Sequence, residues 1–301
     1  MHQIHCICNG NKKISRQNQR ILIQLQTQFG DKFNCYYSPT TADARAYIHA
    51  LDATCTHLLC IGGDGTFNTL INGVCTHPNA GFQPILGVVP NGTGNDFFRS
   101  AGFEKNTDFA TLIQGGGYEK FDVGLIDTEA EKRYFANIAD VGFGGAVVLE
   151  LQRFRKNFGP NFSYGLAIIR TFLKYKRPSI TIQSENYSYT GELLLAAFCN
   201  GSIFGDGLCI HPKAKINDGL LKLTLLGKVS LFDYIKNVSG VKRGLKIKHP
   251  EAFYINCSFP LSLNCEQQTL HAETDGEYIS GHCFKIDLCP GKLKLLATSK
   301  D

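Results

Sequence analysis

The sequence lacks any apolar stretch long enough to cross a membrane. Its longest apolar runs, such as residues 193–199, fall far short of the roughly 20 residues that a spanning helix needs. The first ten residues, MHQIHCICNG, lack the cationic start and the apolar core of a secretory signal peptide. We therefore expect a soluble protein of the cytoplasm.

Closely paired cysteines are also absent. The 12 cysteines are scattered from Cys6 to Cys289, and no C-x-x-C spacing occurs among them. Because zinc sites usually draw on such pairs, a structural zinc would need ligands from distant segments. Free, buried thiols are the expectation.

The length of the chain and the distribution of its charges predict two domains and an anionic partner. A chain of 301 residues suits two domains around a shared cleft. Lys and Arg number 11 against 14 Asp and Glu in residues 1–150, 16 against 5 in residues 151–250, and 4 against 7 in residues 251–301. The basic middle region predicts an anionic partner, which nucleic acid, a membrane face or a phosphorylated ligand would satisfy. A solvated basic face is the alternative that charge alone leaves open.

Strand-like and helical patterns alternate over the first 125 residues. They predict strands at 4–8, 33–37, 57–61 and 85–89, with helices at 15–29, at 42–51 and from about Thr66. This alternation favours a parallel sheet with helices on both faces.

After about Asp122 the pattern changes. Helical patterns occur only near residues 145–156, 162–176 and 230–239, and turns rich in Gly, Asn, Asp and Pro separate the other segments. We expect a second, mainly antiparallel domain from about residue 125. Its strands are predicted at 134–139, 179–183, 192–198, 220–226, 253–257, 269–274 and 284–288.

Two glycine-rich segments follow predicted strands: residues 62–66, GGDGT, and residues 90–97, PNGTGNDF. Glycines let a backbone approach a ligand closely, and amides at the next helix start bind phosphate oxygens. The carboxylate of Asp64 suits phosphate carried with Mg²⁺. Both loops would face one crevice at the carboxyl ends of the strands, whereas tight turns are the simpler alternative. Neither loop matches the Walker or G-x-G-x-x-G pattern.

Further carboxylates follow at Asp122, at Asp218 and in the pair Asp275 and Glu277. Asn-Asp-Gly is typical of a hairpin turn, so for Asp218 a plain turn is at least an equal alternative. Asp275 and Glu277 sit two apart and would share one face of a short extended stretch. A carboxylate there would accept a proton from a hydroxyl nucleophile.

Together these segments resemble the diacylglycerol kinase catalytic domain in its compact bacterial lipid kinase form, over nearly the whole chain. GGDGT is shared with NAD kinases and phosphofructokinases, but its combination with GTGNDF and NDGLL is much more specific. The matching segments, in the family's order, are residues 62–66, 90–97, 121–124 (FDVG), 141–144 (VGFG), 216–221 (INDGLL) and 275–277 (DGE).

The resemblance implies a Rossmann-like α/β nucleotide-binding domain and a C-terminal antiparallel β-sandwich domain, with the active site in the cleft between them. The first would comprise residues 1–125, completed by the C-terminal segment 290–301, and the second, which takes the lipid, residues 126–289. It also implies transfer of the γ-phosphoryl group of ATP to the hydroxyl of diacylglycerol or a related membrane lipid. The product would be phosphatidic acid or another lipid phosphate.

The resemblance assigns roles to residues as well. Glu277 would be the general base, helped by Asp275, and Asp64 would belong to the Mg²⁺-nucleotide site. A second, structural Mg²⁺ would bind Asp218 with the neighbouring carbonyls of Ile216 and Leu220. Residues 9–12, NGNK, depart from the family's Asn-Pro opening, which puts nucleotide contacts at that loop in doubt. The ATP-binding set would be Asn9, Ser38 or Thr40, Gly62, Gly63, Gly65, Thr66, Thr93, Asn95, Asp96 and Asp122.

Residues 153–158, RFRKNF, and 170–177, RTFLKYKR, interleave cations with aromatic and aliphatic groups. Such segments lie in anionic membrane interfaces, at about 1 kcal/mol per cation. A helix pair that packs its apolar stripes and turns its cations outward is an equal alternative. We expect a membrane lipid substrate and peripheral contact with an anionic membrane surface. No nucleic-acid fingerprint accompanies these segments, so nucleic acid is not expected, and a homodimer stays open.

Two other functions compete with a lipid kinase. A soluble kinase like the NAD kinases would share GGDGT, but GTGNDF, NDGLL and the basic aromatic segments argue against it. A catalytically silent lipid- or nucleotide-binding protein would explain the altered first loop. Retention of Asp64, Asp96, Asp122, Asp275 and Glu277 argues against that alternative.

Overall fold

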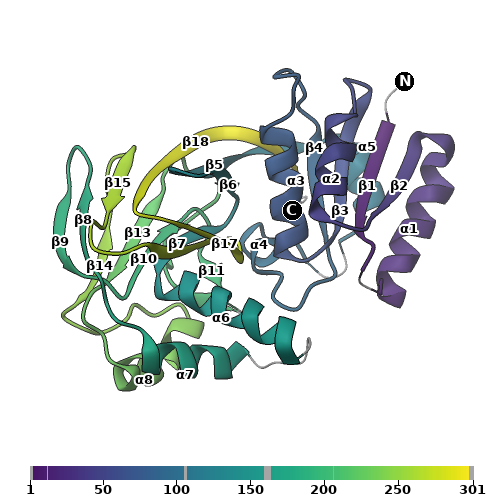
Figure 1. The fold of residues 1–301 in the computed structure, drawn as a ribbon. Coiled ribbons are helices and arrows are strands. Elements are labelled where there is room, and N and C mark those ends of the chain that lie inside the picture. The colour runs from purple at the N-terminus through teal and green to yellow at the C-terminus, as the bar shows by residue number, and fades with distance from the viewer. Residues whose placement is uncertain (1–2, 12, 105–106, 159–163, 206, 298–301) are drawn as a thin grey trace.

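The structure is a computed structural model that describes residues 3–11, 13–104, 107–158, 164–205 and 207–297. Its N-terminal half contains a parallel sheet in the strand order β2-β1-β3-β4 (Figure 1). These strands are almost continuously apolar because helices cover both faces of the sheet. They are β1 (Gln3–Asn9), β2 (Phe33–Ser38), β3 (Cys55–Gly62) and β4 (Ile85–Pro90).

The helices of this half pack in two groups. Right-handed crossovers place the helix after β1 on one face and those after β2 and β3 on the other. Accordingly α2 packs against α3, and α1 packs against α5. The helices are α1 (Arg16–Phe29), α2 (Thr41–His49), α3 (Asp64–Cys75), α4 (Asp96–Ser100) and α5 (Phe109–Gly115), with a 3-10 turn, η1 (Gly30–Lys32).

The C-terminal half consists of two facing antiparallel layers. One continues the first sheet through β5 (Tyr118–Thr128), β6 (Lys132–Phe135), β8 (Ser179–Gln183), β9 (Ser188–Glu192), β15 (Leu261–Asn264) and β18 (Cys283–Leu296). The other is six-stranded, in the order β14-β13-β10-β7-β16-β17. It comprises β7 (Ile138–Gly142), β10 (Leu195–Cys199), β13 (Lys222–Leu226), β14 (Ala252–Ile255), β16 (Leu270–Thr274) and β17 (Glu277–Gly281).

Apolar side chains from both layers, among them Phe135, Val141, Phe198 and Phe284, form one buried core between them. A small hairpin of β11 (Ile203–Phe204) and β12 (Leu208–Cys209) lies outside the two layers. The α/β domain followed by an antiparallel β-sandwich confirms the predicted fold class.

Two long strands join the halves. β18 runs antiparallel to β5 from the pair Phe284–Thr128 to the pair Leu296–Tyr118, and its last residues pair in parallel with β4. In Figure 1 it is the yellow arch between the two halves. Only 284–288 of this strand was predicted, because Pro290 and Gly291 interrupt the pattern; a shift in register between Cys289 and Leu293 accommodates them.

Helices α6 (Phe143–Phe158) and α7 (Tyr164–Lys174) pack on the outer face of the six-stranded layer. Helix α8 (Leu231–Lys242) lines an apolar cavity together with them and with β10 and β13. Two strand predictions were wrong in detail. Residues 134–139 are the end of β6 and the start of β7, and residues 192–198 join the end of β9 to β10. Among the described residues, no helix combines the length and the apolar character that crossing a membrane requires.

Candidate active site

The carboxyl ends of all four parallel strands meet at one edge of the sheet, where a cavity of about 430 Å³ opens. Such an edge is where open α/β sheets bind ligands. The hairpin between β16 and β17 closes the cavity from the other half of the molecule. The predicted nucleotide residues among its lining are Asn9, Ser38, Thr40, Gly63, Asp64, Gly65, Thr66 and Thr93.

The two glycine-rich loops touch each other through their backbones. A Cβ atom on Gly92 would lie 2.5 Å from the Cα of Gly63, so no side chain fits between them. The Asn91 amide donates to the Gly62 carbonyl at 2.8 Å. Asn95, with a φ of 52°, closes the second loop by accepting from the Gly92 amide at 3.0 Å and donating to the Gly92 carbonyl at 2.9 Å. Asn95 therefore shapes the loop.

Asp64 and Asp96 direct one oxygen each toward Gly94. A Cβ atom on this glycine would lie 3.3 Å from Asp64 Oδ2 and 3.5 Å from Asp96 Oδ2. The other oxygens are held in place: Asp64 Oδ1 accepts the Phe97 amide at 2.9 Å, and Asp96 Oδ1 accepts the Gly207 amide at 3.2 Å. Two converging carboxylates supply the hard oxygen donors that Mg²⁺ prefers.

Glu277, the first residue of β17, lies against the first glycine loop. A Cβ atom on Gly65 would be 2.7 Å from Glu277 Oε1. Burial raises the pKa of Glu277, and the Arg133 guanidinium opposes that shift. A raised pKa brings a carboxylate closer to the range in which general bases work.

The prediction that Asp275 and Glu277 share one face of an extended stretch was wrong. Asp275 and Gly276 have φ values of 49° and 89° and form the turn between β16 and β17. Asp275 Oδ1 accepts from the amides of Asn137 and Ile138, and Oδ2 accepts from the Ala136 amide and from the Asn68 side chain, all at 2.8–3.1 Å. Burial raises its pKa to about 6, although these hydrogen bonds oppose the shift. Asp275 thus anchors the turn that carries Glu277.

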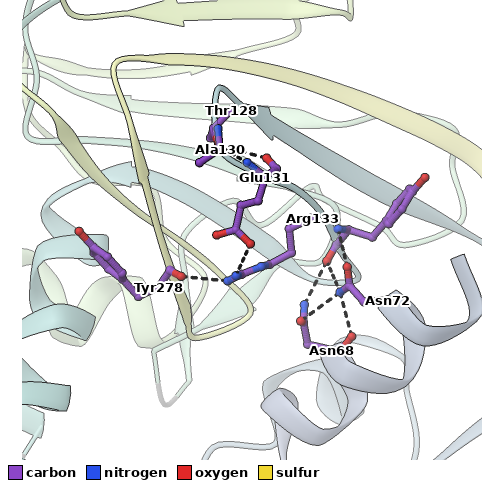
Figure 2. A network of polar contacts seen from close by, with 8 residues as sticks. Asn68, Asn72, Thr128, Ala130, Glu131, Arg133 and Tyr278 are labelled. Atoms are coloured by element: carbon purple, nitrogen blue, oxygen red, sulfur yellow. Dashed lines mark hydrogen bonds and ion pairs between the residues drawn. The ribbon is translucent and has the colours of Figure 1, made fainter. Parts of the chain in front are cut away.

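A polar network that the sequence did not reveal fixes the same region (Figure 2). Asn72, on α3, pairs with the backbone of Tyr134 on β6, accepting from its amide at 2.9 Å and donating to its carbonyl at 2.9 Å. Asn68 donates to that carbonyl at 3.1 Å. Arg133 donates to the Tyr278 carbonyl, next to Glu277, and pairs with Glu131 at 2.7 Å. Asp275 and Tyr278, the residues on either side of Gly276 and Glu277, are therefore both anchored by hydrogen bonds.

The hydroxyl groups after β2 have partners within the protein. Thr40 is the N-cap of α2, accepting the Asp43 amide and donating to Asp43 Oδ2. Ser38 Oγ donates to the Thr40 carbonyl at 2.5 Å. Asn9 Oδ1 accepts the Asn11 amide at 3.0 Å. These side chains shape the wall of the cavity.

Asp122 and Asp218 lie together, apart from the cavity residues. The carboxylate of buried Asp122 accepts the Gly219 and Gly291 amides, both at 2.7 Å, and its amide donates to the Ile216 carbonyl. Asp218 accepts the Leu220 amide and lies 3.7 Å from Lys222 Nζ. Asp122 thus ties the 216–219 turn to β18, and the structure does not bring it to Asp64.

A second cavity, of about 390 Å³, adjoins the first. Asp64, Thr93, Asp275, Gly276 and Glu277 line both cavities. Apolar side chains of Val148, Leu151 and Phe204 also line the second one.

The second cavity holds an acidic pair that local sequence could not reveal. Asp140 and Glu273 are direct cross-strand neighbours on β7 and β16, and both are buried. Burial raises the pKa of Asp140 to about 7 and that of Glu273 as well.

The fold and the site define a two-domain protein in which two glycine-rich loops line one cavity together with the carboxylates of Asp64 and Glu277. The family model of the diacylglycerol kinase catalytic domain matches residues 3–126, and that of the YegS C-terminal NAD kinase beta sandwich-like domain matches residues 137–297. The chain therefore belongs to the diacylglycerol kinase catalytic-domain family of lipid kinases, as the motifs predicted.

Two relatives illustrate the relationship. A diacylglycerol kinase of Staphylococcus carnosus is 27% identical, over 90% of this chain and 86% of its own. A Yersinia enterocolitica protein named "Probable lipid kinase YegS-like" is 28% identical, over 96% of this chain and 94% of its own.

Two solved structures share the fold. A diacylglycerol kinase from Bacillus anthracis has a TM-score of 0.72 at 19% identity, covering 99% of this chain and 97% of its own. An NAD kinase from Archaeoglobus fulgidus in complex with ATP has a TM-score of 0.55 at 9% identity, covering 99% and 95%.

Proposed function

We propose that the protein transfers the γ-phosphoryl group of ATP to the hydroxyl of diacylglycerol or a related membrane lipid, at a membrane surface of the cytoplasm. The observation that carries the proposal is the position of Glu277. It touches the glycine loop of the first cavity and lines the second, partly apolar cavity. A carboxylate between a phosphate site and an acceptor site is where a general base for phosphoryl transfer belongs.

Different residues of the chain would bind the ATP phosphates, hold Mg²⁺ and accept the proton of the lipid hydroxyl. The backbone of residues 63–66 and 92–93 would bind the ATP phosphates, since glycine lets it approach them closely. Asp64 and Asp96 would hold Mg²⁺, which when bound neutralises charge on the transferring group. Glu277 would accept the proton of the attacking hydroxyl. Asp275 and Arg133 keep the Glu277 backbone in position.

The structural Mg²⁺ proposed at Asp218, Ile216 and Leu220 has suitable oxygen donors, but it must compete with the nearby Lys222 ammonium. Asp122 stabilises the turn of residues 216–219 by accepting hydrogen bonds from the Gly219 and Gly291 amides. Its proposed contribution to ATP binding is therefore indirect.

The direct test is transfer of label from γ-labelled ATP, with Mg²⁺, to lipids in mixed micelles, followed by organic extraction. Labelled lipid phosphate that is lost in Glu277→Gln supports the proposal. Label transferred only to added NAD would instead indicate a soluble kinase. ATP binding without transfer to any lipid would indicate a silent binding protein.

A further inference from the structure

Exposed apolar side chains gather on the outer surface of two helices. On α7, Leu166, Ile169 and Leu173 are exposed at a spacing of three and four residues, which places them on one helix face. Leu173 is 76% exposed. On α8, Phe232 is 73% exposed, and Ile235, one turn further, is exposed too. A face of this kind on a folded protein indicates a partner.

The inner sides of the two helices face one apolar cavity. Ile168 of α7 and Val238 and Val241 of α8 line it. Because these residues point inward, the exposed residues on both helices point away from the protein. The two helices lie next to each other at the lower edge of Figure 1. We call the exposed side chains of Leu166, Ile169, Leu173, Phe232 and Ile235 the α7–α8 face.

Cations accompany the α7–α8 face. Lys174 and Lys176 follow Leu173, and Lys236 and Lys242 are exposed on α8. They belong to the basic middle region, where Lys and Arg outnumber Asp and Glu by 16 to 5. Apolar groups flanked by lysines match the boundary between acyl chains and anionic headgroups. The predicted segment 170–177 thus includes part of this face, whereas the side chains of 155–158 lie outside the described residues.

The α7–α8 face also lies over a cavity that adjoins the site. Gly144 and Phe204 line both the apolar cavity beneath the two helices and the cavity that contains Glu277. The cavity that contains Glu277 and the apolar cavity beneath the two helices are therefore neighbours that share a wall.

We propose that the α7–α8 face is the surface with which the protein docks on an anionic lipid bilayer, its apolar side chains inserting between the headgroups. This inference rests on the proposed lipid kinase function, and it adds the location of the membrane contact. The occupant is a bilayer, because the flanking lysines complement anionic headgroups and the cavity beneath the two helices adjoins the cavity that contains Glu277.

The chain contains no tryptophan, so a single introduced indole reports on its own position. Leu173→Trp should show a blue-shifted emission and quenching by brominated acyl chains when vesicles containing anionic phosphatidylglycerol are added. Ile23→Trp is the matched control, since Ile23 is 66% exposed on α1 in the other half. A response that is equal at both positions, or absent at Leu173, would overturn the proposal. So would a shift that depends on protein concentration without vesicles, because it would identify a second copy of the chain as the occupant.

Activity separates this proposal from the proposed function. Leu173→Ser with Phe232→Ser should weaken vesicle binding by about tenfold per residue and lower turnover of vesicle-embedded lipid in parallel. Turnover of a short-chain acceptor in micelles should stay within about twofold of the unaltered protein. Vesicle binding that needs the α7–α8 face, without any lipid phosphorylation in micelles, would refute the kinase function and keep the docking surface. Unchanged vesicle binding by the double variant would refute the docking surface.

Discussion

Glu277 Oε1 lies so close to Gly65 that a Cβ atom on this glycine would stand 2.7 Å from it. The two residues come from different halves of the molecule, Gly65 from the first turn of α3 and Glu277 from the start of β17. Their contact sets the distance between the glycine loop and the carboxylate. Any change at either residue should therefore affect chemistry before it affects folding.

Gly65→Ala tests this contact. The new methyl group must displace the Glu277 carboxylate, and a small misplacement of a reacting group costs on the order of a hundredfold in rate. We expect kcat to fall by about that factor, while the free energy of unfolding changes by about 1 kcal/mol or less, since alanine favours the helix. Gly115→Ala is the control, because it lies at the end of α5 with no atom within 4 Å of its Cβ position. Equal activity of the two variants would contradict the role of the contact.

Glu277→Gln removes the proposed base and keeps the shape of the side chain. Loss of a general base typically costs about 10²–10⁴ in kcat. The base acts only when ionised, and burial raises its pKa, so activity of the unaltered protein should fall with decreasing pH at a higher pH than for an exposed glutamate. The pH profile of kcat/KM measures this acid limb. An unchanged acid limb in the residual activity of Glu277→Gln would assign it to another group.

The gathering of the glycine-rich loops at one edge of the sheet could be predicted because it depends on local features. Short apolar runs end at glycine-rich loops, and parallel pairing brings all such ends to one edge whatever the details. Residues 63–66 and Thr93 therefore line one cavity with Asn9 and Ser38.

The positions of the carboxylates from the C-terminal half depend on the register between strands that are distant in sequence. No local sequence pattern specifies this register. Asp275 accepts hydrogen bonds from the amides of residues 136–138 only because of the register in which β16 pairs with β7. The same register places Glu273 opposite Asp140. The spacing of Asp275 and Glu277 suggested an extended stretch, but the Asp-Gly turn prevailed. The sequence also did not predict which side of α7 is exposed, because amphipathic spacing does not show which of two apolar stripes packs inward.

Asp122→Asn distinguishes a structural from a nucleotide-binding role. Both oxygens of Asp122 accept backbone amides, from Gly219 and Gly291, and an asparagine retains only one acceptor. A buried amide left without a partner costs about 1–3 kcal/mol. We expect the free energy of unfolding to fall by that amount in chemical denaturation, with KM for ATP within about twofold of the unaltered value. A large rise in KM without loss of stability would show that Asp122 acts on the nucleotide.

Asp64→Asn and Asp64→Ala together separate the two functions of Asp64. Its Oδ1 accepts the Phe97 amide, which orients α4, and its Oδ2 faces Gly94 together with Asp96. Asparagine retains an acceptor for Phe97 but loses the charge for Mg²⁺, so kcat/KM should fall by at least about a hundredfold with little change in stability.

Alanine at position 64 loses both functions and should also lower the free energy of unfolding by about 1.5–3 kcal/mol, the value of a hydrogen bond to a charged group. Titration of activity with Mg²⁺ provides the second measurement. Asp64→Asn should require a higher Mg²⁺ concentration for half-maximal rate, whereas Asp122→Asn should not. If Asp64→Asn kept the unaltered Mg²⁺ dependence, the converging oxygens of Asp64 and Asp96 would not be the metal site.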